Sequence, residues 1–264
     1  EGSQDQQEIV YADCDLKGLN HCHSEGSPVQ TKLDNHANEC YPSESCGLIV
    51  NGDYFPCRNI GPIDNFEIHP DDWIAAEESG EIQAIVHSHP DGLPTLSSGD
   101  RISQVKSGLP WWIICNGEIH KYDCVPHLLG RTFEHGKTDC FSIIRDAYHL
   151  AGIQIKDYAR EDDWWKDGKN YYMDNIIDAG FYRVDSPQEG DVILISLGNH
   201  KPNHGTIYAG NQRILHSRPD RLSKRDVYGG FWQQYTDSIW RHKDWLHSSW
   251  AAVTADLEAS MSLR

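Results

Sequence analysis

The sequence lacks any apolar run long enough to cross a bilayer, which takes about 20 residues. The longest candidate, GLPWWIIC at residues 108–115, is far too short. The opening EGSQDQQE is polar and acidic, so it does not have the pattern of a secretory signal peptide. We therefore expect no membrane span in this chain.

Positive charge is scarce. The chain has 23 Lys and Arg against 40 Asp and Glu, which gives a formal net charge of −17. A field of this sign repels phosphate backbones and anionic lipid surfaces. We therefore expect no nucleic-acid partner.

Cys-x-x-Cys motifs are also absent, although the chain contains eight cysteines. In 264 residues this number favours reduced thiols, either buried or catalytic, over a disulfide framework. HCHS at residues 21–24 offers metal donors, but no second ligand pair follows at zinc-finger spacing. We therefore do not predict a metal site there.

What the chain does have is enough apolar and aromatic residues for buried cores, including 9 Trp and 12 Tyr. The residue patterns predict two α+β domains. VPHLLGRTFEHGKT looks like a linker between them. Asn-Gly pairs predict hairpin turns at residues 51–52 and 116–117, and a helical pattern begins at Thr31. The predicted segments are an irregular leader at 1–30, a first domain at 31–127, a second at 130–245, and a tail at 246–264 for which a helix is one option.

The stretch AIVHSHPDGLPTLSSGD suggests a metal site. Side chains alternate along a strand, so His87 and His89 project from the same side. Ser97 starts a helix, and Asp100 three residues later brings a carboxylate back toward the end of the strand. Each part has a simpler explanation, since Ser97-x-x-Asp100 is also a helix N-cap and His-x-His is often surface. Taken in order, they favour one zinc ion with an open fourth position.

A hydrolytic zinc site also needs a base, and Glu44 in PSESCGLIV is the best candidate because it precedes a strand. This Glu, followed by His-Ser-His-Pro and Ser-x-x-Asp, resembles the JAMM (MPN-type) metallopeptidases over residues 31–125. The resemblance implies a cytidine-deaminase-like α/β fold and one bound Zn2+. It also implies that Glu44 takes a proton from water and that Ser97 helps to hold the oxyanion. The implied zinc ligands are His87, His89 and Asp100.

A second candidate site begins at TDCFSIIRDAYHLAGI. The apolar residues after Cys140 recur at helical spacing as far as Gly152, and Asp139 is a suitable N-cap. A cysteine at a helix N-terminus is favoured as a thiolate. The alternative is a buried structural cysteine, which is a common fate of that residue.

Downstream, GDVILISLGNHKPNHGTIYAGNQRILHS predicts a strand at 192–197 and a hairpin with strands at 204–208 and 212–216. Placing His204 opposite His216 requires a three-residue loop, Ala209-Gly210-Asn211. A two-residue turn would put the two histidines on opposite faces. The spacing therefore allows a His–His relay if the longer loop or a bulge is used.

Asp-Cys at a helix start, Gly-Asp-Val before a strand, and HGTIYAGNQRILH resemble the NlpC-type cysteine peptidases over about residues 130–245. The resemblance implies a papain-like α+β domain that cleaves peptide stems of bacterial cell walls. Many members have a Tyr shortly before the Cys, near the oxyanion, and Tyr122 is too far away to be assigned that part. The implied roles are nucleophile for Cys140, base for His204 and orienting residue for His216.

A JAMM domain followed by an NlpC-type domain resembles the K-type tail tip assembly proteins of lambda-like siphophages. This implies partners among other tail tip proteins, one of them a ubiquitin-like protein, with peptidoglycan as substrate. It implies a place in the virion tail tip, after assembly in the host cytoplasm, and action at the cell wall or periplasm. Two alternatives stay open, a structural assembly component with idle sites and an isopeptidase that processes the ubiquitin-like protein. Trp164, Trp165, Tyr171 and Tyr172 form either a docking surface or core.

Overall fold

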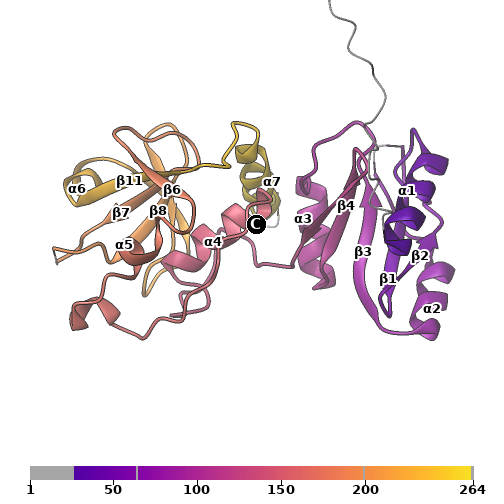
Figure 1. Cartoon of the computed structure of the whole chain (residues 1–264), viewed down its shortest axis with the longest axis horizontal. Coiled ribbons are helices and arrows are strands. Elements are labelled where there is room, and N and C mark those ends of the chain that lie inside the picture. Colours follow the sequence, from indigo (N-terminus) through magenta and orange to yellow (C-terminus); the bar gives the residue numbers. More distant parts are fainter. Residues whose placement is uncertain (1–26, 64, 199, 263–264) are drawn as a thin grey trace, which may run out of the picture.

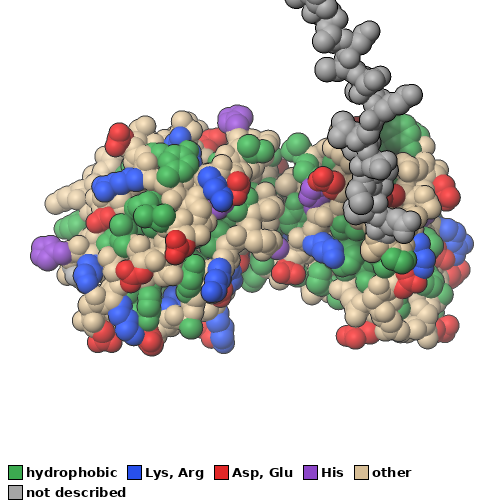
Figure 2. Space-filling view, viewed as in Figure 1, with side chains coloured by type: hydrophobic (Ala, Val, Ile, Leu, Met, Phe, Trp, Pro, Cys, Tyr) green, Lys and Arg blue, Asp and Glu red, His purple; other side chains and the backbone are tan. Residues whose placement is uncertain are grey.

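The computed structural model describes residues 27–63, 65–198 and 200–262, which form two mixed helix-and-sheet halves (Figure 1). The HCHS motif lies outside the described residues. Within them, no helix combines the length and apolar character that crossing a bilayer requires. The six described cysteines are free thiols, as the sequence predicted. On the face shown in Figure 2, Lys and Arg are interspersed with Asp and Glu.

The first half is built on a five-stranded sheet in the order β2-β1-β3-β4-β5. β3 and β4 run parallel and are connected through α3, whereas the other neighbouring strands are antiparallel. Its elements are α1 (Pro28–Cys40), β1 (Cys46–Val50), β2 (Asp53–Cys57), α2 (Pro70–Ser79), β3 (Ile82–Ser88), α3 (Ser98–Ser107), β4 (Trp111–Cys115) and β5 (Glu118–Tyr122).

Local residue preferences explain most of these boundaries. The Asn51-Gly52 and Asn116-Gly117 pairs have positive φ angles, which the tight turns β1–β2 and β4–β5 require, so both predicted hairpins are confirmed. α1 begins earlier than the predicted Thr31, because Ser27 caps the helix and Pro28 suits its first turn.

Both faces of this sheet are buried. Leu48 and Ile85 contribute to the main core cluster of the molecule, which extends into the second half. Their neighbours Ile49 and Ala84 point the other way and pack with Leu33 of α1. Strands covered on both faces are rich in apolar residues without polar alternation, which is the pattern of β1 and β3.

The second half contains a six-stranded antiparallel sheet in the order β10-β9-β8-β7-β11-β6. α4 packs against β8 of this sheet. Trp164 and Tyr172 are buried, so for these two the core alternative holds. The elements are α4 (Cys140–Leu150), η1 (Trp164–Asp167), α5 (Tyr171–Asn175), β6 (Phe181–Val184), β7 (Val192–Ile195), β8 (His204–Tyr208), β9 (Arg213–His216), β10 (Lys224–Val227), α6 (Gly230–Gln234), β11 (Thr236–His242) and α7 (Ser249–Ser262).

The segment between the halves is held in place by hydrogen bonds. The Gly130 backbone N–H donates to the carbonyl of Ser223, and the Ser223 backbone N–H donates to the carbonyl of Arg131. The Ser223 hydroxyl accepts from the Arg131 backbone N–H and donates to the carbonyl of Leu128. The chain then returns at its end, where α7 packs against α3 of the first half (Figure 1). The expected linker is therefore part of a shared interface.

Asp256 of α7 is the centre of that interface. Its fully buried carboxylate accepts hydrogen bonds from Arg101 Nε at 2.9 Å, His127 Nδ1 at 2.8 Å and the Leu128 backbone N–H at 2.7 Å. Burial opposes ionisation, but the His127 hydrogen bond and the Arg101 charge hold the pKa of Asp256 below its usual value. One carboxylate thus joins α7, α3 and the connecting segment.

We expect Asp256→Ala to lower the free energy of unfolding by about 3–5 kcal/mol, because it leaves the buried Arg101 charge without its partner. Urea denaturation followed by tryptophan fluorescence measures the change. Glu258→Ala, at an exposed position of the same helix, is the control and should change stability by less than about 0.5 kcal/mol. A loss below about 1 kcal/mol in Asp256→Ala would show that the ion pair does not hold the halves together.

Candidate active sites

The first candidate site lies where β3 ends and α3 begins. β3 contains His87, His89 follows directly after the strand, and Asp100 is in the first turn of α3. The Nε2 atoms of the two imidazoles are 2.9 Å apart, and each lies 3.4 Å from a different oxygen of Asp100. The fold therefore brings together the three side chains that the sequence predicts as zinc ligands.

These donors fit a catalytic zinc ion. Two imidazole nitrogens and a carboxylate oxygen converge within 4.8 Å of one another, and zinc accepts such ligands while keeping a fourth position open. His89 Nδ1 lies 2.7 Å from the carbonyl oxygen of Leu93, so Nδ1–H donates and Nε2 keeps its lone pair for a metal. Burial disfavours ionisation of Asp100, but the adjoining imidazoles of His87 and His89 hold its pKa well below the usual range.

A capping box aims the Asp100 carboxylate. The Ser97 hydroxyl accepts from the Asp100 backbone N–H at 3.1 Å, and Asp100 Oδ2 accepts from the Ser97 backbone N–H at 2.8 Å. The simpler explanation for Ser97-x-x-Asp100, a helix cap, is therefore correct. It is compatible with the metal-site explanation, because the same cap presents Asp100 to the two histidines.

Glu44 lies near this cluster, just before β1. It lines a cleft of about 600 Å3 together with His89, Ser97 and Asp100. The Asn59 side chain donates to the Glu44 backbone carbonyl at 3.0 Å, which anchors this segment. The remaining wall of the cleft includes small side chains from the other half of the chain, namely Ala251 and Ala255 of α7.

The second candidate site starts at the N-terminus of α4. Asp139 caps the helix as predicted, accepting from the backbone N–H groups of Phe141 and Ser142. Arg160 binds the same carboxylate through two nitrogens, at 2.7 and 2.8 Å. Burial opposes ionisation of Asp139, but Arg160 lowers its pKa to about 2. The cap is thus an ion pair that anchors the start of the helix.

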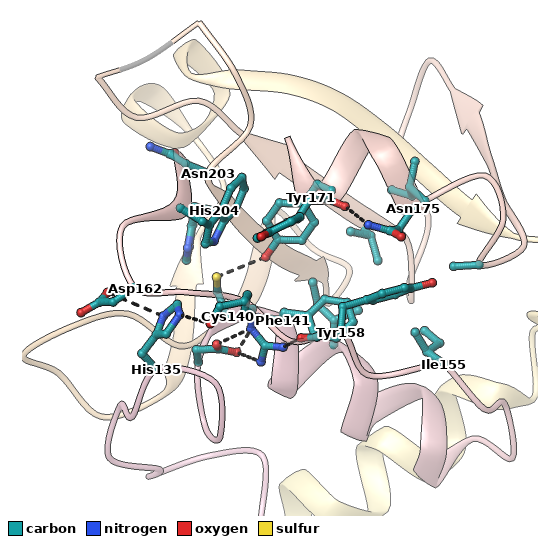
Figure 3. Close-up of a pocket in the computed structure, with 18 of the residues that line it drawn as sticks. His135, Cys140, Phe141, Ile155, Tyr158, Asp162, Tyr171, Asn175, Asn203 and His204 are labelled. Carbon is teal, nitrogen blue, oxygen red and sulfur yellow. Dashed lines mark hydrogen bonds and ion pairs between the residues drawn. The ribbon is translucent and has the colours of Figure 1, made fainter. Parts of the chain in front are cut away.

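The Cys140 thiol faces a cavity of about 240 Å3 that His204 also lines (Figure 3). Its Sγ lies 3.2 Å from the hydroxyl of Tyr172. Gly205 passes so close that a Cβ there would lie 2.7 Å from the Tyr172 hydroxyl and 2.8 Å from Ile144. A glycine is therefore needed after His204 if Tyr172 is to reach the thiol.

His204 and His216 make the ring contact that the predicted relay requires, although the hairpin register differs from the one expected. His204 Nε2 lies 3.0 Å from His216 Nδ1. Tyr208 pairs with Ile214, not with Gln212, so residues 209–212 connect the strands and the two histidines are diagonal neighbours. The register shift is two residues, an even number, so both rings stay on the same face of the sheet.

Two further residues of this site were missed by the sequence analysis. Tyr172 contacts Cys140 from 32 positions downstream, and no local pattern in YYMDN marks it. Asp226 Oδ2 lies 3.0 Å from His216 Nε2. The consecutive charged residues of β10 could have suggested an edge strand, but not its partner. Tyr122 lies elsewhere and donates to the carbonyl of Pro94.

Electrostatics favour a neutral resting pair. Burial, followed by the Asp139 charge, raises the pKa of the Cys140 thiol above its ordinary value. Burial, with smaller contributions from His216 and Arg218, lowers the pKa of His204 to about 3. At pH values between the pKa of His204 and that of Cys140, the thiol keeps its proton and the imidazole is uncharged. This differs from the thiolate that the helix N-terminus alone favours.

We therefore expect alkylation of Cys140 by iodoacetamide to rise roughly tenfold per pH unit between pH 6 and 9, because only the thiolate reacts. Peptide mass spectrometry of the Cys140 peptide measures the rate separately from the other cysteines. Cys124 is the internal comparison, since its pKa is also raised by burial. A Cys140 rate that is flat over this range would indicate a preformed thiolate–imidazolium pair instead.

Comparisons with known proteins cover both halves. Residues 26–125 match prokaryotic homologs of the JAB domain, and residues 130–241 match the NlpC/P60 family. The chain is 53% identical over 193 residues to tail tip assembly protein K of Escherichia phage lambda, covering 72% of this chain and 97% of that protein. It is 36% identical over 223 residues to tail tip assembly protein K of Escherichia phage N15, covering 79% and 92%.

The solved structures that match this chain include NlpC/P60 proteins. NlpC1 from Trichomonas vaginalis is 15% identical with a TM-score of 0.32. The match covers 57% of this chain and 49% of NlpC1, so this chain spans about half the length of NlpC1. An NlpC/P60 family protein from Bacillus cereus is 13% identical with a TM-score of 0.34, covering 80% and 66%.

Proposed function

Because the chain belongs to the tail tip assembly protein K family, with a JAB-related half and an NlpC/P60 half, we propose that it is a phage tail tip protein with two hydrolase sites. One is a zinc peptidase site and the other is a cysteine peptidase site that cleaves peptidoglycan stem peptides. The observation that supports the proposal best is the meeting of Cys140 and His204 at one cavity, with His216 behind the base.

In the cysteine site, Cys140 attacks the carbonyl of the stem peptide and forms an acyl-enzyme. His204 takes the thiol proton and later gives a proton to the leaving amine, while His216 orients His204. The Tyr172 hydroxyl lies against the sulfur and keeps its proton, because burial raises its pKa well above the ordinary value. We assign it as a hydrogen-bond donor to the oxyanion, the part for which the sequence offered no residue.

In the first half, the proposed zinc ligands are His87, His89 and Asp100. A zinc ion bound there supplies Lewis acidity and lowers the pKa of a water molecule. Glu44 takes the proton from the attacking water, and the exposed Ser97 hydroxyl, whose hydrogen is not used by the helix cap, donates to the developing oxyanion. Ala251 and Ala255 of α7 line the same cleft as Glu44, so the second half contributes one wall of this site.

The names of the relatives support the tail tip as the proposed setting, and the family resemblance suggests the other locations. The chain is assembled into the tail in the host cytoplasm, resides at the tail tip of the virion, and acts at the cell wall or periplasm. The proposed partners are other tail tip proteins, and the alternative function of the first half is an isopeptidase that processes a ubiquitin-like tail protein. DNA is not a proposed ligand, because the chain carries a strongly negative net charge.

We expect purified protein to contain about one zinc ion per chain and His87→Ala to retain at most about a tenth of that, because loss of one of three protein ligands weakens binding steeply. Elemental analysis after dialysis against trace zinc measures both. His120→Ala, on β5 of the same half, should bind zinc like the parent. Asp100→Asn is a second ligand variant, which tests the assignment independently if His87→Ala does not fold. Equal zinc contents in all four proteins would contradict the ligand assignment.

We expect Cys140→Ala to release stem peptides from purified peptidoglycan at least about 10³-fold more slowly than the parent, with His204→Ala almost as slow. His216→Ala should lose less activity, since it acts through His204. Mass analysis of the soluble products gives both the rate and the bond cleaved. Cys124→Ala is the matched control and should digest at the parental rate.

Three outcomes would contradict this assignment. Parental digestion by Cys140→Ala would make the thiol structural. Digestion that persists in Cys140→Ala and stops with a chelator would place the lytic activity in the zinc site. A folded, zinc-loaded parent that digests no wall type would favour the structural assembly component.

A further inference from the structure

The relay behind Cys140 continues beyond His216 to a carboxylate. From β8, His204 Nε2 lies 3.0 Å from Nδ1 of His216 on β9, and Nε2 of His216 lies 3.0 Å from Oδ2 of Asp226 on β10. These three adjacent strands place the side chains in one row, because β9 pairs with both β8 and β10. The other carboxylate oxygen of Asp226 accepts from Lys224 Nζ at 2.7 Å.

The two imidazole contacts allow only two arrangements of their protons, since a neutral imidazole has one N–H and one lone pair. In the first, His216 Nε2–H donates to Asp226, and His204 Nε2–H donates to His216 Nδ1. In the second, both protons are reversed, and His216 Nε2 turns its lone pair toward the carboxylate. An acceptor facing an ionised acceptor at 3.0 Å is repulsive, so an ionised Asp226 selects the first arrangement.

The first arrangement is also the one that chemistry at Cys140 requires. It leaves a lone pair on Nδ1 of His204, the ring nitrogen not occupied by His216, on the residue that lines the thiol cavity (Figure 3). The reversed arrangement puts a proton on that nitrogen, and His204 then cannot take one from the thiol. Selection of the proton position at His216 is therefore transmitted to the base.

We propose that Asp226 is a positioning residue that acts through His216 to keep Nδ1 of His204 unprotonated. The proposal rests on the assignment of Cys140 and His204 as nucleophile and base. When the thiol proton moves to His204 Nδ1, the proton on its Nε2 can pass to His216 Nδ1. The positive charge then resides on His216, directly against the Asp226 carboxylate, and no further proton donor is needed.

Other groups near the relay do not supply this selection. Lys224 and Arg218 are cations, which disfavour a charged His216 instead of orienting its neutral form. Trp232 packs against both rings, with its centroid 4.8 Å from that of His216, and holds their planes without a hydrogen bond to either. Among the described residues, Asp226 is the carboxylate with a hydrogen bond to this relay.

The test is direct observation of the proton positions in the full-length protein labelled with 15N-histidine. Two-dimensional 1H–15N spectra through the ring protons distinguish Nδ1–H from Nε2–H imidazoles, and His204→Gln and His216→Gln assign the two signals. In the parent at pH 7 we expect both histidines to be protonated on Nε2. In Asp226→Asn, whose amide can donate to His216 Nε2, we expect the reversed form to appear at both histidines.

Lys224→Gln is the matched control, because it removes the other partner of Asp226 and keeps the carboxylate. Its two histidines should resemble those of the parent. The proposal is overturned if His204 in the parent carries its proton on Nδ1, if Asp226→Asn leaves both histidines unchanged, or if Lys224→Gln reverses them equally.

Peptidoglycan digestion gives the functional counterpart. We expect Asp226→Asn to slow stem-peptide release about 10- to 100-fold, less than the ~10⁴-fold loss when a carboxylate contacts the base directly. In a His216→Ala background the same substitution should have no further effect, because the connection is already broken. An additive loss would show that Asp226 acts elsewhere. If the spectra behave as expected but the parent digests no peptidoglycan, the proposed substrate is wrong and the role of Asp226 stands.

Discussion

The buried contact between Arg101 and Asp256 is the constraint on which the arrangement of the two halves depends. Two charges removed from water contribute little net stability, but removing one of them leaves the other buried and unpaired at high cost. The pair therefore forms only where α7 packs against α3. Because Arg101 directly follows Asp100, the same contact fixes the helix that carries a proposed zinc ligand. It also sets Ala251 and Ala255 of α7 against the proposed zinc cleft.

Both candidate sites use the start of a helix to hold a functional side chain. In one, the Ser97–Asp100 capping box satisfies free backbone donors and at the same time directs the carboxylate toward two histidines. In the other, Asp139 caps α4 so that Cys140 is its first residue. The ion pair of Asp139 with Arg160 limits the effect of this charge, yet burial still raises the pKa of the thiol.

Much of the local structure was predictable because it depends on near neighbours. The Asn-Gly hairpins, the helix that starts at Ser98 and the helix that starts at Cys140 follow from turn chemistry, capping residues and apolar spacing. The register of the β8–β9 hairpin was predicted wrongly, since loop length is not determined by Gly210 alone. The contact between His204 and His216 is nevertheless present, because a register shift of an even number of residues keeps each side chain on the same face of its strand.

The sequence by itself determined the separate groups of reactive side chains, because His-x-His, Ser-x-x-Asp and Asp-Cys each act within one element or one turn. Only the tertiary structure decided which distant residues complete them. Tyr172 meets Cys140 across 32 positions and Asp256 meets Arg101 across 155. Such contacts depend on how strands and helices pack, which periodicity does not encode. The partner of His216 was likewise decided by the pairing of β9 with β10.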